Sequence, residues 1–159
     1  MADGIDLQEE LARGRHTASS SAWSADTTAA QANDGNFISQ FPHVFQSSND
    51  DYQAWWRVEL DIPTTNPVVR IHARDCCTAN FRHALQIRIG PSAAFQEATV
   101  CATISNRPGD LYAPVGLTDS GVFDARCMGR GKYLFVATEP DFEYIETPMS
   151  WQDASAECH

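Results

Sequence analysis

The sequence predicts an all-β protein built as a sandwich or jelly roll in a single domain. Short segments in which apolar and polar residues alternate recur along the chain, and turns rich in Gly, Pro and Asn separate them. No extended segment repeats its apolar residues with the 3.6-residue period of an amphipathic helix. Because each alternating strand buries one face, the chain is expected to pack two antiparallel sheets together, with little helix.

The clearest predicted strand covers residues 55–61. Its apolar residues Trp56, Val58 and Leu60 face one way and charged residues face the other, which is the pattern of a half-buried strand. The two prolines in the turn at 62–67 are expected to end it. Further strands are expected at residues 68–74, 85–90, 98–101, 121–125, 133–137 and 142–147.

The segment 18–36 is predicted to be an ordered loop. It is rich in small and polar residues, and Trp23 is its only large apolar side chain. A loop of this length needs a fixing interaction other than core packing, and a bound cation would provide one. Asp34 and Asn36 offer hard oxygen ligands on either side of Gly35, although a plain β-turn explains the same residues.

The overall charge argues against two classes of partner. The 159 residues include 21 acidic and 11 basic side chains, a formal charge of −10, which repels nucleic acid and anionic membrane surfaces. No apolar run reaches the roughly 20 residues of a membrane-spanning helix. The first dozen residues fit either a short helix or an edge strand. They lack the pattern of a secretion signal, so either a signal has been removed or the protein is not classically secreted.

The five cysteines, at positions 76, 77, 101, 127 and 158, allow at most two disulfide bonds and leave one thiol. Three interpretations of the adjacent pair Cys76 and Cys77 stay open. The pair could form a vicinal disulfide, or pack in reduced form as small apolar residues. It could also build a zinc or nucleophilic site with His72 and His83. A catalytic cysteine needs a base and oxyanion donors that the sequence does not supply, so we predict no enzyme activity.

A positive stripe precedes the two cysteines. Arg70, His72 and Arg74 share one face of the strand, because side chains two residues apart point the same way. Guanidinium groups there could donate several hydrogen bonds to a polar ligand. The alternative is an ordinary solvated face whose arginines pair with Glu59 or Asp61 across the sheet. Trp55 and Trp56 are both expected to pack in the sheet, with stacking of Trp55 on a bound ligand as the weaker alternative.

Several segments match one known family in order and spacing. The most specific are Asp-Cys-Cys at 75–77 and Trp-Trp-Arg-Val-Glu-Leu at 55–60 upstream of it. The others are residues 11–15, 19–21, 34–36, 87–90, Cys101, and Cys127 ahead of 131–133. With these motifs the chain resembles the F-type lectins, or fucolectins, within the discoidin-like sandwiches. The resemblance covers about residues 5–150 of a single domain, 1–159, and leaves 151–159 as a C-terminal tail.

The resemblance implies an eight-stranded jelly roll that binds L-fucose in a loop-lined pocket and carries a structural calcium ion. Cys76 and Cys77 would form a vicinal disulfide in the pocket wall, and Cys101 would pair with Cys127. The implied calcium ligands are Gln31, Asp34, Asn36 and Glu146.

The sugar-binding motif of the family matches less closely. Ala73 and Asn80 occupy its two arginine positions, and arginines stand instead at Arg74 and Arg82. A loop one residue longer after Cys77 would bring Arg82 into the second position. His43 lies near the position of a sugar-binding histidine in the family. It could equally be an ordinary histidine in a surface loop. The expected sugar-binding residues are therefore His43, Arg74, Asp75, Cys76, Cys77 and Arg82.

Two functions follow from these residues. The first is a calcium-stabilised lectin of the fucose-binding type, extracellular or secreted, with fucosylated glycans as partners and homo-oligomers for avidity. The alternative is a structural or protein-interaction subunit of a larger assembly, cytoplasmic, that kept the sandwich and lost sugar binding. The shifted arginines and the spare Cys158 favour the alternative.

Overall fold

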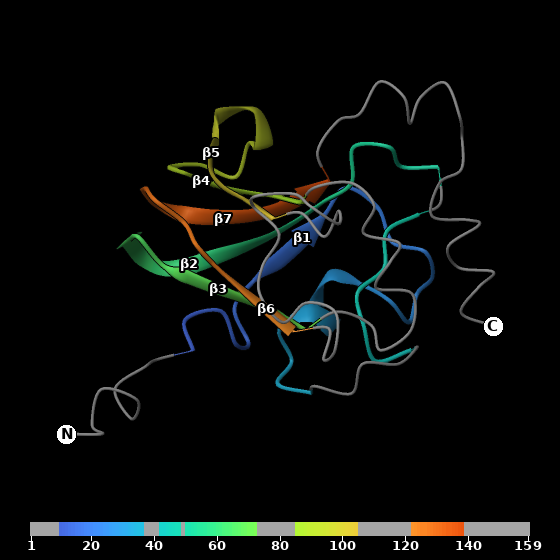
Figure 1. The fold of residues 1–159 in the computed structure, drawn as a ribbon. Helices are drawn as coiled ribbons and strands as arrows, with labels where there is room; N and C mark the ends of the chain where they lie inside the picture. The colour runs from blue at the N-terminus through green and yellow to red at the C-terminus, as the bar shows by residue number, and fades with distance from the viewer. Residues whose placement is uncertain (1–9, 37–41, 49, 73–84, 105–121, 139–159) are drawn as a thin grey trace.

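The protein is an all-β sandwich of two antiparallel sheets, as the sequence predicts (Figure 1). The computed structural model describes residues 10–36, 42–48, 50–72, 85–104 and 122–138. A five-stranded sheet has the order β1-β2-β7-β4-β5, and β3 pairs with β6 in a second sheet. The strands are β1 (Thr17–Ser19), β2 (Trp55–Thr65), β3 (Val68–His72), β4 (Leu85–Gly90), β5 (Thr99–Ile104), β6 (Val122–Arg126) and β7 (Arg130–Thr138).

The helical content of the described residues is limited to two short 3-10 helices. These are η1 (Ala29–Ala32), in the loop after β1, and η3 (Phe95–Glu97), between β4 and β5. None of the helices in the described ranges has the length and apolar character that a membrane crossing requires. The strand expected at 142–147 lies outside the described residues, as do the first nine residues.

Two strand predictions were wrong in detail. The segment expected to be loop from residue 18 contains most of β1, which is too short to show an alternating pattern. The turn at 62–67 does not end β2 where expected, because β2 continues to Thr65. Its pairing with β7 shifts register between Glu59 and Thr64. Pro63 lies in this irregular stretch, where a missing backbone N–H breaks no regular ladder bond.

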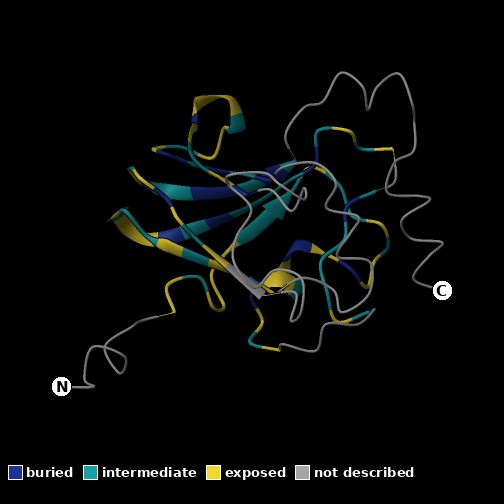
Figure 2. Cartoon of the chain, in the orientation of Figure 1, coloured by how far each residue is buried: buried dark blue, intermediate teal, exposed yellow. Residues whose placement is uncertain are grey.

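The core lies between the two sheets. The expected inward positions of β2, Val58 and Leu60, are 1% and 4% exposed. From the two-stranded sheet, Val69, Ile71 and Ala125 pack against the same cluster, so the predicted apolar face of β3 is confirmed as far as His72. The buried cluster consists of Val58, Leu60, Leu85, Ile87, Ile89, Ile104, Cys127 and Leu134. Figure 2 shows the buried residues gathered mainly on strands of the five-stranded sheet.

The outer face of the five-stranded sheet carries a second apolar cluster. Phe135 of β7 is fully buried there, on the face opposite Leu134. Phe95 of η3 and Trp55 of β2 both meet its ring edge to face, with centroids 5.6 Å and 5.7 Å away. Trp55 and Phe95 stack on each other at 6.1 Å, nearly parallel. The connection between β4 and β5 therefore folds back over the sheet and seals its outer face.

Two arginines hold this connection in place. The guanidinium carbon of Arg88 lies 4.3 Å from the centroid of Phe95. Arg57 Nη1 donates a hydrogen bond of 2.9 Å to the carbonyl of Ala93, and its guanidinium sits 5.8 Å from the ring of Trp55. Cation–π contact and hydrogen bonding thus attach the connection to both β2 and β4.

The start of β7 passes β4 without room for a side chain. A Cβ atom at Gly131 would lie 2.5 Å from the carbonyl oxygen of Gly90. A Cβ atom at Gly90 would lie 2.9 Å from the Cα atom of Ala98. Glycine is required at both positions, because any side chain would push β7, β4 and the loop after it apart.

Replacing Phe135 should test the outer cluster. Phe135→Ala removes a buried ring that both Trp55 and Phe95 contact, and should lower the free energy of unfolding by about 3–5 kcal/mol. Chemical denaturation followed by far-UV circular dichroism measures this loss. Val100→Ala, at a β5 position 49% exposed, is the control and should cost under about 1 kcal/mol. Equal losses in both variants would show that the outer cluster adds no stability.

Candidate functional site

Hydrogen bonds between two loops organise one end of the sandwich. Ser21 Oγ donates to Asp51 Oδ2 at 2.6 Å and accepts the backbone N–H of Ser48 at 3.0 Å. Ser20 Oγ donates to the same carboxylate oxygen. The backbone N–H of Trp23 donates to the carbonyl of Gln46 at 2.8 Å. The loop after β1 and the segment before β2 are therefore held together by side-chain and backbone polar groups instead of by core packing.

The candidate calcium loop follows η1. Gly35 has a φ of 85°, and the backbone N–H of Asn36 donates to Asp34 Oδ1 at 2.8 Å, so Asp34 to Asn36 form a tight turn. Asp34 and Asn36 are exposed and Gln31 is half-buried. Glu146 lies outside the described residues. In the described part of the chain no three His, Cys, Asp or Glu side chains form a metal-binding group, so the calcium site stays a prediction.

Asn33 fixes this loop, although no pattern in the sequence predicts that role. Its side-chain Nδ2 donates to the carbonyls of Ala12 at 2.6 Å and Arg15 at 2.9 Å. Its own carbonyl accepts the N–H of Gly14 at 2.9 Å. Trp56 Nε1 adds a bond of 2.9 Å to the carbonyl of Ala29. A buried amide thus anchors this loop. The length of the loop predicts a bound cation for that role.

Most of the expected sugar-binding residues lie outside the described residues. They are Arg74, Asp75, Cys76, Cys77 and Arg82. His43 is described and exposed, in the segment 42–48 that contacts Trp23 and Thr27 through Gln46. Arg70 and His72 are also exposed on β3, as their expected common face requires. Because β3 ends at His72, it leads directly into the segment that carries the Asp-Cys-Cys motif.

Arg70 has a different partner from the two that the sequence suggested. Its Nε and Nη2 atoms donate to Asp124 Oδ1 and Oδ2 at 2.8 Å and 3.0 Å, a bidentate bridge between directly opposed residues of β3 and β6. Glu59 instead contacts Lys132 at 3.5 Å, and Asp61 contacts Arg15 at 3.4 Å. The expected partners were wrong because β2 and β3, although consecutive, lie in different sheets.

The bridge affects the ionisation of both groups. The hydrogen bond from the Arg70 guanidinium lowers the pKa of Asp124 below its ordinary value, with a further contribution from the positive charge of Arg70. The same hydrogen bond and the charge of Asp124 raise the pKa of Arg70. Both side chains remain well exposed to solvent, so the pair serves mainly to fix the register of β3 on β6.

Trp55 packs in the sheet, as its main interpretation predicted. One face of its ring stacks on Phe95, its edge contacts Phe135, and the Arg57 guanidinium lies 5.8 Å from its centroid. The protein itself therefore supplies the stacking partners of this ring, and the alternative of a sugar stacked on Trp55 loses its main support.

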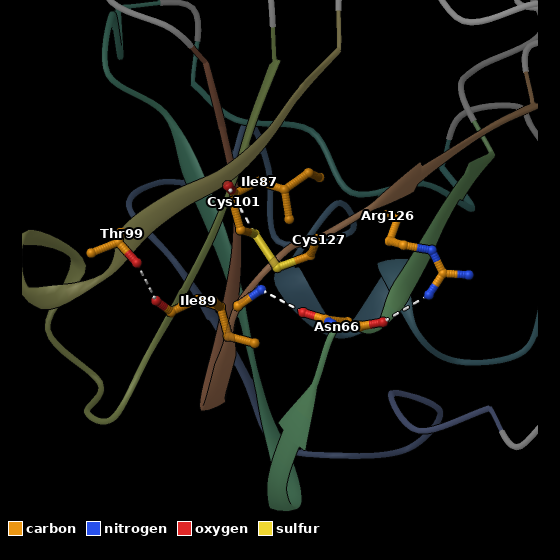
Figure 3. Close-up of a disulfide and its surroundings, with 8 residues drawn as sticks. Asn66, Ile87, Ile89, Thr99, Cys101, Arg126 and Cys127 are labelled. Atoms are coloured by element: carbon orange, nitrogen blue, oxygen red, sulfur yellow. Dashed lines mark hydrogen bonds between the residues drawn. A yellow bond between two sulfur atoms is a disulfide. The ribbon is translucent and has the colours of Figure 1, made fainter.

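The disulfide between Cys101 and Cys127 that the resemblance implied is present (Figure 3). It joins β5 to the corner where the chain passes from β6 to β7, and Cys127 is fully buried. Asn66, at a φ of 50°, closes the other side of this corner. Its Oδ1 accepts the N–H of Gly129 at 2.9 Å, and its own N–H donates to the carbonyl of Gly129 at 2.7 Å. Figure 3 shows the disulfide and Asn66 flanking this corner.

Comparison with known proteins places this geometry in a class. No protein-family model and no curated protein matches the chain in sequence. Solved structures do match. The fucolectin from striped bass (Morone saxatilis) serum matches with a TM-score of 0.64 and 23% identity over 82% of this chain, which spans 42% of that lectin. A fucose-binding module of Streptococcus pneumoniae, SpX-3, matches with a TM-score of 0.58 and 17% identity over 82% of this chain and 86% of the module.

A third match widens the class. Chitosan-binding module 1 from a chitosanase/glucanase of Paenibacillus sp. IK-5 has a TM-score of 0.61 and 19% identity, over 84% of this chain and 91% of the module. The protein therefore has the β-sandwich fold that F-type lectins share with other carbohydrate-binding modules. The matched chains are binding modules, although one is derived from a larger enzyme. At these identities the similarity establishes the fold and leaves the ligand to be tested.

The Arg70 bridge should leave a pH signature. A lowered carboxylate pKa stabilises the folded protein at neutral pH, and this contribution is lost as the pH falls through the lowered pKa of Asp124. Asp124→Asn should therefore lower the thermal midpoint slightly at pH 7 and match the wild type in strong acid. Asp26→Asn, in an exposed loop, is the control. A difference for Asp124→Asn that persists unchanged in acid would contradict this assignment.

Thiol counting checks the disulfide chemistry. Because the Cys101–Cys127 bond uses two of the five cysteines, alkylation of the unreduced native protein should label at most three thiols. A Cys76–Cys77 bond would reduce the number to one. Intact-mass measurement reads the count directly. Four or five labelled thiols would show that the Cys101–Cys127 bond does not form.

Proposed function

We propose that the protein is a calcium-stabilised lectin of the fucose-binding type. The observation that carries this proposal is the sandwich shared with fucose-binding proteins, together with an Asp-Cys-Cys motif placed directly after β3. The resemblance of the sequence and the similarity of the structure point to the same class. The match to a chitosan-binding module supports carbohydrate recognition in general. The choice of fucose as the ligand depends on the Asp-Cys-Cys motif.

The proposed pocket uses the loops at the end of β3. Cys76 and Cys77, joined as a vicinal disulfide, would give the apolar face of the sugar a flat surface. Arg74 and Arg82 would donate hydrogen bonds to its ring oxygen and hydroxyl groups. His43, already exposed on the segment next to Trp23, would contribute from the opposite loop. Recognition of this kind needs no bond breaking, so we propose binding without catalysis.

The proposed calcium ion would be held by oxygen ligands of the loop after η1. Asp34 and Asn36 are exposed on one tight turn, and Gln31 comes from the preceding helical turn. Carboxylate and amide oxygens are the ligands that Ca²⁺ prefers. Glu146 would complete the set. When bound, the ion would stiffen this loop beside the anchoring amide of Asn33.

The proposal also covers the location and the oligomeric state of the protein. A disulfide is most stable in an oxidising compartment, which favours an extracellular or secreted location. A single shallow sugar site binds weakly, so we propose that several copies act together. The second candidate is a structural subunit without sugar binding. One observation favours it. Arg70, which belongs to the positive stripe on β3, forms an ion pair with Asp124.

A glycan array with and without chelator tests the proposed function. The wild type should retain fucosylated glycans in calcium and lose most of the signal after chelation. Cys76→Ser and Asp34→Ala should each weaken binding about tenfold or more, because they remove the plate and a calcium ligand. Asp61→Asn, on the exposed middle of β2, should bind like the wild type. If no fucosylated glycan is retained at any calcium concentration, the structural-subunit function takes its place.

A further inference from the structure

The three most exposed large apolar side chains of the described residues gather at one corner of the sandwich. Ile62, Met128 and Val68 are 68%, 64% and 54% exposed. They stand on the stretches 62–68 and 126–131, which face each other where the pairing of β2 with β7 gives way to that of β3 with β6. A concentration of exposed apolar side chains on a hydrogen-bonded backbone indicates an interaction surface.

Two exposed arginines flank Met128 in this corner. Arg126 Nη1 donates to the carbonyl of Asn66 at 3.3 Å, and Arg130 Nη1 donates to Thr65 Oγ1 at 2.8 Å. In Figure 3 the side chain of Arg126 and the disulfide lie on opposite sides of Asn66. Both acceptors are uncharged, so these bonds hold the two cations in place without neutralising them. A protein of formal charge −10 thus keeps a local positive charge beside its exposed apolar side chains.

The sequence that precedes the described residues has the complementary character. Residues 1–9 lie outside the described part of the chain. They include two branched apolar residues, Ile5 and Leu7, no lysine or arginine, and acidic residues at 3, 6 and 9. A segment that combines carboxylates with apolar side chains matches both properties of the corner.

The described chain begins near enough for this segment to reach the corner. Arg15 Nη1 lies 3.4 Å from Asp61 Oδ1, and Asp61 directly precedes Ile62. Residues 3–9 can extend over about 24 Å. The path along β2 from Asp61 to Thr65 is only about 13 Å. A tethered segment also has an effective concentration in the millimolar range, whereas the net charge of the protein repels a separate acidic partner.

We propose that the corner surface, formed by Ile62, Val68, Arg126, Met128 and Arg130, is the docking site of residues 2–9 of the same chain. In this arrangement the carboxylates of the segment pair with the two guanidinium groups, and its apolar side chains cover the exposed apolar residues. The corner surface lies at the start of β3 and the Asp-Cys-Cys motif follows the end of that strand, so docking leaves the proposed sugar pocket open. The inference does not depend on the proposed function.

Oxidation of Met128 by dilute hydrogen peroxide tests the proposal. Peroxide transfers one oxygen atom to the thioether sulfur, giving the sulfoxide and water, and the rate follows the exposure of the sulfur. Removal of residues 2–9 should raise the rate at Met128 at least threefold, as peptide mapping by mass spectrometry measures. High salt should raise the rate in the full chain as well, because it screens the ion pairs. Equal rates in the full and shortened chains would overturn the proposal.

Charge variants of the full chain keep the test independent of the deletion. The combined change Asp3→Asn, Asp6→Asn and Glu9→Gln should raise the oxidation rate of Met128 at least twofold. The matched control Gln8→Asn removes no charge and should oxidise like the wild type. Thermal unfolding of both variants should match that of the wild type. An unchanged rate in the triple variant would overturn the role of the carboxylates and with it the proposal.

Arg126→Glu examines the other side of the same contact. It should raise the oxidation rate of Met128 at least twofold, whereas Arg126→Lys should keep most of the protection. Adding Asp6→Arg to Arg126→Glu should restore part of the protection, because the charges are then exchanged. A rate that stays at the wild-type value in Arg126→Glu would contradict the proposed docking.

An added peptide and the protein concentration distinguish this occupant from others. A synthetic peptide of residues 1–11 should slow Met128 oxidation in the shortened chain at roughly millimolar concentration, and a scrambled peptide of the same composition should not. Protection that grows with protein concentration, together with a dimer in light scattering, would assign the corner surface to a second copy and overturn the proposal. Absence of protection in both chains at every concentration would leave the surface to a separate partner and overturn it equally.

Discussion

The pairing of β7 on both sides is the constraint on which the five-stranded sheet depends. β7 lies between β2 and β4, and Trp55 at the start of β2 pairs with Ala137 near the end of β7. These partners are far apart in the sequence, so the sheet closes only after a large part of the chain has been ordered. The Cys101–Cys127 disulfide and the bonds between Asn66 and Gly129 fix the corner from which β7 starts. Correct placement of that corner sets the register of the sheet.

The sandwich and the loops at its end are held together by different interactions. The two-sided packing of β7, with Leu134 in the inner core and Phe135 under Trp55 and Phe95, makes the sheet a firm support. The loops at its end are then ordered by polar side chains, chiefly Asn33 and Asp51. Loops fixed in this way can change their surface residues without disturbing the core. The same fold occurs in a fucose-binding module and in a chitosan-binding module that are 17% and 19% identical to this chain.

The strands could be predicted because alternation is a local property. β4 has the expected bounds, since Gly90 and Pro91 end it, and the inward residues of β2 were identified. Non-local features could not be predicted from the sequence pattern. The partner of Arg70 depends on β3 joining β6, and the burial of Phe135 depends on η3 folding back over the sheet. For the site, the tight turn from Asp34 to Asn36 was predicted, whereas the anchoring by Asn33 depends on carbonyls of residues distant in sequence.

The buried disulfide also determines what a laboratory preparation of this protein contains. Cys127 is fully enclosed, so a chain that folds while its cysteines are reduced would have to close the corner between β6 and β7 with hydrogen bonds alone, among them those between Asn66 and Gly129. Material produced in a reducing cytoplasm and material exported through an oxidising compartment would then share a sequence and differ at the point where the central strand begins. Binding measurements on the two would describe two different molecules, so the oxidation state belongs beside every affinity measured for this protein.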